Sequence, residues 1–110
     1  MTQKYLFLGS MGQNRSPTVA RVAEDIAKRK GLDIEMSYGG VDTGMDRVQL
    51  FEWVNQYDKI FVMEERMITE RLNSVVINPR KVFCLYIEDN YSREDAQLVG
   101  ILEDELKLFI

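Results

Sequence analysis

Residues 4–31 read KYLFLGSMGQNRSPTVARVAEDIAKRKG, and in this stretch an apolar run, a glycine-containing loop and an amphipathic segment follow one another. The run at 4–8 is continuously apolar and aromatic after its first lysine and stops at a glycine, which is typical of a strand buried on both faces. Beyond the loop, Ser16 and Pro17 suit an N-cap and the first position of a helix. The stretch therefore predicts a strand, a tight loop and a helix that begins immediately after Arg15.

The rest of the chain continues this alternation of strands and helices. Further apolar runs predict strands at 34–38, 59–63 and 81–87. Apolar spacing predicts a short helix at about 48–54 and a C-terminal helix whose stripe contains Leu98, Ile101, Leu102, Leu106 and Phe109. Acidic residues in the first turn indicate a further helix at 64–73. In the short helix, Val48, Phe51 and Val54 form the expected apolar face, widened by Leu50 and Trp53. Four parallel strands with helices on both faces, a three-layer α/β/α architecture, are the expected result.

Length and charge narrow the range of functions. A chain of 110 residues matches one compact domain, 1–110, and its net charge of -4 disfavours sequence-independent binding to nucleic acid or to anionic membranes. No apolar stretch approaches the length of a membrane span, so a cytoplasmic protein is expected. The sequence has no histidine and a single cysteine, Cys84, which excludes imidazole catalysis, histidine metal sites and an internal disulfide. We expect no cofactor and no metal.

The loop between the first strand and the first helix is the leading candidate site. An open α/β sheet binds ligands at the carboxyl ends of its strands, and here glycines, backbone N–H groups and a helix N-terminus suit a phosphate or sulfate ion. Arg15 supplies a planar fork that can hold two phosphate oxygens. The predicted phosphate-binding residues are Ser10, Met11, Gly12, Gln13, Asn14, Arg15 and Ser16. The alternative is an ordinary strand-to-helix turn, capped by Ser16, with Arg15 solvated.

This loop resembles the Cys-x5-Arg-Ser/Thr signature of the low-molecular-weight protein tyrosine phosphatase family, in particular its short prokaryotic branch. Residues 15–18 match the family's Arg-Ser-Pro-Thr, and Asp89 and Tyr91 are placed like the acid and the aromatic residue of its Asp-Pro-Tyr/Trp loop. The resemblance covers nearly all of the chain and includes residues 51–53, 58–64 and 87–91.

The resemblance implies a four-stranded parallel sheet in the order 2-1-3-4 and a role for each matching residue. Arg15 would bind phosphate and stabilise the transition state, Ser16 would hydrogen-bond the nucleophile, and Asp89 would protonate the leaving oxygen. Tyr91 would form a wall of the pocket. The ligand would be a phosphorylated protein or a small phosphomonoester.

The chain departs from the family at the nucleophile, because Gly9 stands where the family has its catalytic cysteine. Without that thiol the covalent route is closed. Ser10 is displaced by one residue and has no base to activate it, and Cys84 lies in an apolar strand, the setting of an inert core thiol. Gly12 replaces the usual loop asparagine. Whether the chain is an enzyme therefore stays open.

Three hypotheses about function remain. The first is a phosphatase-like protein that binds a phosphate monoester but is inactive, through natural or engineered loss of the cysteine. The second is a pseudophosphatase that serves as a phospho-ligand or protein-binding module, and the third is a structural domain with a relic loop. The charged run Glu64-Glu65-Arg66 is interpreted as a solvated face and is assigned no function.

Overall fold

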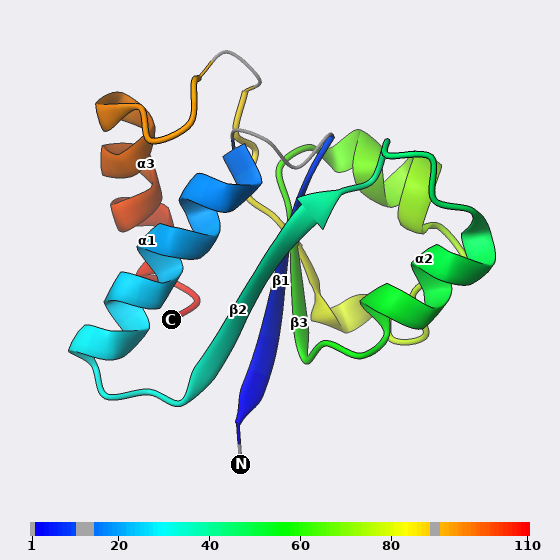
Figure 1. Cartoon of the computed structure of the whole chain (residues 1–110), viewed down its shortest axis with the longest axis horizontal. Helices are drawn as coiled ribbons and strands as arrows, with labels where there is room; N and C mark the ends of the chain where they lie inside the picture. Colours follow the sequence, from blue (N-terminus) through cyan, green and yellow to red (C-terminus); the bar gives the residue numbers. More distant parts are fainter. Residues whose placement is uncertain (1, 11–14, 89–90) are drawn as a thin grey trace.

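The computed structural model describes residues 2–10, 15–88 and 91–110. A central sheet is covered on one face by α1 and α3 and on the other by α2 and η1, as Figure 1 shows, so the expected three layers are present. In chain order the elements are β1 (Gln3–Gly9), α1 (Arg15–Arg29), β2 (Ile34–Gly40), α2 (Arg47–Val54), β3 (Lys59–Val62), η1 (Met67–Leu72), η2 (Pro79–Lys81), β4 (Val82–Cys84) and α3 (Ala96–Leu106).

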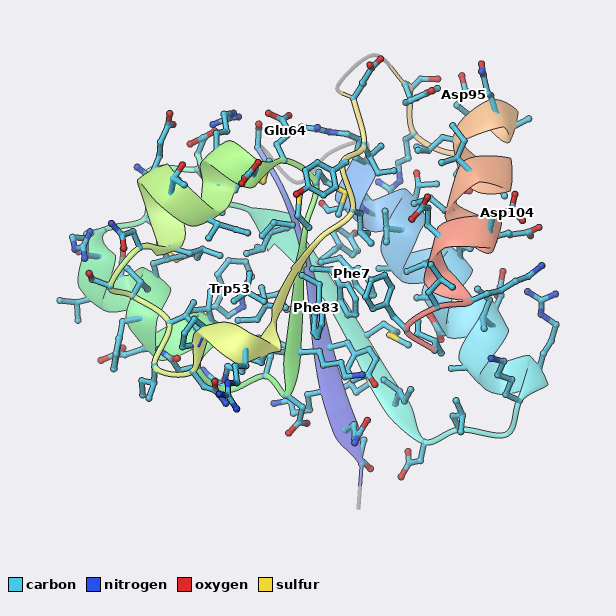
Figure 2. The ribbon with its side chains drawn as sticks, turned by 180° about the vertical axis from the view of Figure 1, so that it is seen from behind. Phe7, Trp53, Glu64, Phe83, Asp95 and Asp104 are labelled. Carbon is cyan, nitrogen blue, oxygen red and sulfur yellow. The ribbon has the colours of Figure 1, made fainter. Side chains whose placement is uncertain are left out.

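The sheet has the order β2-β1-β3-β4 with every pair parallel, which confirms the expected fold class and strand order. Its register sets Phe7 opposite Phe61 and Phe61 opposite Phe83. The rings stack with centroids 5.0 Å and 5.4 Å apart, and Phe109, just after α3, meets Phe61 edge-on at 5.4 Å. This aromatic row anchors the end of α3 to the sheet, on the side where Figure 2 shows Phe7 and Phe83.

Helix α1 begins at Arg15, one residue earlier than predicted, so the prediction of Ser16 as its N-cap is wrong. The Ser16 hydroxyl instead donates a hydrogen bond to the Gly39 carbonyl of β2 at 3.2 Å. The predicted apolar stripe is buried against the sheet, and Gly31 ends the helix region in the left-handed conformation, with φ of +68°. A tertiary contact to the neighbouring strand therefore replaces the local cap.

Helix α2 forms where it was predicted, but its buried face differs. Leu50 and Val54 are buried, whereas Val48 is 67% exposed and Phe51 is 42% exposed. The helix starts with a capping box in which Asp46 and Gln49 bond reciprocally. In a helix of eight residues an i, i+3 series is compatible with either of two faces, and packing of Leu50 and Val54 on the sheet decides between them.

The fourth strand is shorter than the predicted 81–87, because it ends at Cys84. Tyr86 adopts a left-handed φ of +54°, which turns its 70% exposed ring outward. The chain still follows β3, since the N–H groups of Leu85 and Ile87 donate to the carbonyls of Val62 and Met63. The helix predicted at 64–73 begins one residue later and continues as the wide η1 turn. Glu64 thus lies outside it, directly after the strand.

Close contact between β2 and α2 gives a stability test. A Cβ atom built on Gly39 would lie 2.8 Å from Trp53 Cζ2 and closer still to Cη2, whereas one built on Gly100 of α3 would meet nothing within 4 Å. We expect Gly39→Ala to lower the free energy of unfolding by about 1–3 kcal/mol because the indole must shift. Gly100→Ala should raise it by up to about 1 kcal/mol through helix propensity. Urea unfolding at neutral pH measures both, and equal effects would contradict the close packing of Trp53.

Candidate functional site

The candidate site lies at the carboxyl ends of the strands, where the loop after β1 meets the segments that follow β2 and β3. The Val41 and Asp42 amides donate to the carbonyls of Gly9 and Ser10 at 3.0 Å and 2.7 Å. These bonds continue the β1–β2 pairing past the end of the strands and hold the backbone of Gly9 and Ser10 in place. Figure 2 shows Glu64 at this same edge.

The Arg15 side chain is buried at this edge. Only 3% of the residue is exposed, and its Nη1 donates to Glu64 Oε1 at 2.6 Å and to the Ile87 carbonyl at 2.8 Å. A guanidinium stays charged when buried, and the short bond to a carboxylate offsets part of its desolvation. The alternative in which Arg15 is solvated is therefore wrong.

Glu64 connects this arginine to a second one. Its Oε2 accepts from Arg66 Nε at 2.9 Å while Oε1 accepts from Arg15. Hydrogen bonds from Arg15 and then from Arg66 hold the pKa of the Glu64 carboxyl below its usual range. The interpretation of 64–66 as a purely solvated face is wrong, because Glu64 pairs with a buried cation. Its position directly after a buried strand, at the same sheet edge as Gly9, was the signal that could have revealed it.

The backbone at Gly9 has room for a side chain. Its φ lies outside the left-handed region, and a Cβ atom built there would meet Ser16 Oγ at 3.4 Å, an ordinary contact distance. Ser16 is fully buried. A side chain at position 9 would therefore extend beside the Ser16 hydroxyl at the end of β1.

The Ser10 hydroxyl lies against Arg66, whose Nη2 donates to Ser10 Oγ at 2.6 Å. The same guanidinium contacts Asp42 at 3.4 Å. The structure thus brings together Gly9, Ser10, Arg15 and Ser16 from the predicted set and adds Glu64 and Arg66. The remaining predicted loop residues, Met11, Gly12, Gln13 and Asn14, and the predicted acid Asp89 lie outside the described residues.

Solved structures match this fold over almost the whole chain. A low molecular weight phosphotyrosine phosphatase from Vibrio cholerae O395 superposes with a TM-score of 0.72 at 17% identity, covering 97% of this chain and 94% of that one. The chain has the fold of the low-molecular-weight protein tyrosine phosphatases. The resemblance found in the sequence is thereby confirmed at the level of this phosphatase fold.

Two further solved structures of tyrosine phosphatases also superpose on this chain. A protein tyrosine phosphatase from Entamoeba histolytica, solved with Hepes in its active site, has a TM-score of 0.73 at 17% identity and covers 97% of this chain and 94% of its own. The tyrosine phosphatase Wzb from Escherichia coli K30, in complex with phosphate, has a TM-score of 0.71 at 17% identity and covers 99% and 96%. No protein-family model matches the sequence, and a search of curated proteins finds no match.

The segment after residue 90 is attached to α1 beside the candidate loop. The Glu94 amide donates to Thr18 Oγ at 2.9 Å, and Arg21 of α1 binds the Glu94 carboxylate through Nε and Nη2. Tyr91 is half-buried and packs against the core. Its role as a pocket wall stays a prediction.

Cys84 does not supply the thiolate that the resemblance expects at position 9. This thiol is half-buried in β4, and burial is the main cause that raises its pKa, so it stays protonated at neutral pH. Among the described residues, no group of three or more acidic or cysteine side chains is placed to hold a metal ion, and none of their helices is long and apolar enough to cross a membrane.

The Glu64 carboxylate gives a pH-dependent prediction. Because its folded pKa is lowered from 4.5, its contribution to stability is complete above that pH and disappears as the pH falls through the folded value. We expect Glu64→Gln to cost about 1–3 kcal/mol of unfolding free energy at pH 7. The difference from the unmodified chain should shrink below pH 4.5.

Urea unfolding across this pH range measures the effect. The matched control is Glu70→Gln, because Glu70 is 64% exposed and its carboxylate lies 3.9 Å from the nearest Arg66 nitrogen. That change should cost less than about 1 kcal/mol. A Glu64→Gln penalty that is independent of pH would contradict the ion pair with Arg15.

Proposed function

We propose that this chain binds a phosphate monoester in the loop from Gly9 to Arg15 and does not hydrolyse it. The observation that carries the proposal is the buried Arg15 guanidinium, held by Glu64 and the Ile87 carbonyl at the carboxyl edge of the sheet. An oriented cation at the first turn of a helix, next to that helix's positive dipole end, is suited to a tetrahedral oxyanion. We expect the ligand to be a phosphorylated protein or a small phosphomonoester in the cytoplasm.

The lack of hydrolysis follows from the chemistry of position 9. In the covalent route a thiolate attacks phosphorus, the ester P–O bond breaks, and an acid such as Asp89 gives its proton to the leaving oxygen. Glycine offers no electron pair for this attack. The space beside Ser16 Oγ supports the inference that a side chain has been lost from this position without rearrangement of the strand.

The missing thiolate also favours the second hypothesis, a binding module. A thiolate at the centre of the loop would repel an incoming anion, so its removal should strengthen resting anion binding. The phosphate complex of the Escherichia coli structure of the same fold supports phosphate as the ligand class. The inactive phosphatase and the pseudophosphatase are two hypotheses that share this binding step. They differ in whether the binding has a biological role in recognising a phosphorylated partner.

Isothermal titration with inorganic phosphate, vanadate and phosphotyrosine tests the binding step. We expect saturable binding at millimolar concentration or below, which Arg15→Ala abolishes because the guanidinium supplies two of the strongest donors. Arg80→Ala is the control, since Arg80 is exposed in η2 at the opposite end of β4 and its removal changes the net charge equally. Binding that survives Arg15→Ala would contradict the site.

Restoring the nucleophile tests the reason for inactivity. Gly9→Cys should hydrolyse p-nitrophenyl phosphate and give a phosphocysteine intermediate detectable by mass spectrometry, whereas Gly9→Ala, which fills the space without a thiol, should not. The gain should be lost with Arg15→Ala and reduced with Asp89→Asn, by about 10²–10⁴-fold for the acid. A folded Gly9→Cys protein that neither turns over nor forms the intermediate would count against the phosphatase-like site.

A further inference from the structure

Arg66 contacts both ends of the candidate loop, one directly and one through a carboxylate. Its Nη2 donates to Ser10 Oγ at 2.6 Å, at the residue that follows β1. Its Nε donates at 2.9 Å to Glu64 Oε2, and the other oxygen of that carboxylate binds Arg15 at the start of α1. One guanidinium therefore connects Ser10, near the start of the loop, with Arg15, which ends it.

We propose that Arg66 is a positioning residue that fixes the separation of Ser10 and Arg15, so that these two residues are in place before the ligand arrives. The inference rests on the proposed function, because it concerns the same phosphate site. Taken by itself, the charged run that contains Arg66 looks like a solvated face and indicates no such role. Its side chain is 39% exposed, at the rim of the site and outside the buried core.

Glu64 transmits the effect of Arg66 to Arg15. Each carboxylate oxygen accepts from a different arginine, so the plane of the carboxylate is fixed from both sides. Without Arg66, Oε2 would be open to water and the carboxylate could rotate about its last bond. The buried Arg15 guanidinium, which also donates to the Ile87 carbonyl, would then have in Glu64 a partner whose position is no longer fixed.

Arg66 also fixes the orientation of the Ser10 side chain. The hydroxyl oxygen of Ser10 accepts a short hydrogen bond from a cation, which lowers its electron density and turns it toward η1. Ser10 is consequently held as an anchor of the loop, which agrees with its unsuitability as a substitute nucleophile.

The contacts require the shape of arginine as well as its charge. Nε and Nη2 of one planar group reach Glu64 and Ser10, and Nη2 also lies 3.4 Å from Asp42, whose amide supports the Ser10 carbonyl. A lysine ammonium at the same place is a single point and cannot keep this spacing. Arg66→Lys therefore separates positioning from charge, while Arg66→Met removes both.

The first measurement is phosphate titration of the unmodified chain, Arg66→Lys, Arg66→Met and the control Arg80→Met, after urea unfolding has shown that each is folded. We expect both Arg66 variants to bind phosphate about tenfold more weakly, the effect of losing one charge-assisted hydrogen bond. Arg80→Met should bind like the unmodified chain. Arg66→Lys that binds normally while Arg66→Met is weakened would show that only charge matters and would overturn the proposal.

The second measurement needs no ligand. Hydrogen exchange followed by NMR at Arg15 Nε–H and at the Asp42 amide should be faster in Arg66→Lys and unchanged in Arg80→Met. A chain that fails to bind phosphate but shows this change would overturn the proposed function and leave the positioning of Arg15 standing. Unchanged exchange together with unchanged phosphate affinity in Arg66→Lys would overturn the inference about Arg66 alone.

Discussion

The parallel pairing of β1 with β3 is the constraint on which the rest of the molecule depends. It places Phe7 against Phe61 in the core and, at the carboxyl edge, brings Glu64 within reach of Arg15, 49 residues away in the sequence. Because the strands are parallel, both loops leave from the same edge. The stacking of Phe7 on Phe61 in the core and the Arg15–Glu64 ion pair at the carboxyl edge both follow from this register.

At that edge the fold accommodates a buried cation by distributing its partners over several elements. Glu64 follows β3, and the Ile87 carbonyl belongs to the segment beyond β4. Tyr86, in its left-handed conformation, directly precedes Ile87, and the Ile87 amide donates to the Met63 carbonyl just after β3. A charged group taken out of water is stable only with such compensation, and here it comes from the segments that follow β3 and β4.

Position 9 shows how little the fold depends on the side chain at the end of β1. The strand has an ordinary φ there, the three atoms nearest to a Cβ atom at this position would all belong to Ser16, and the Gly9 carbonyl accepts from the Val41 amide. Anion binding by backbone, helix terminus and guanidinium is physically separate from nucleophilic attack. A chain can therefore retain the first property after losing the second.

Several features were determined by the sequence alone. Apolar runs of strand length, each followed by an amphipathic segment, were enough for the parallel α/β architecture, and the resemblance extended this to the strand order. The loop before α1 could be located because glycines and an arginine stand between a buried strand and a helix. These are local patterns, and the propensities of neighbouring residues decide them.

Only the tertiary structure decided which polar groups meet. The role of Glu64 and the contact of Arg66 with Ser10 depend on strand register and on where η1 begins, and both residues belong to a charged run that looks solvated when taken by itself. The exposed Val48 and Phe51, the use of Ser16 toward Gly39 instead of a cap, and the end of β4 at Cys84 have the same origin. In each case the local sequence is compatible with more than one arrangement, and contacts between segments distant in the sequence select one of them.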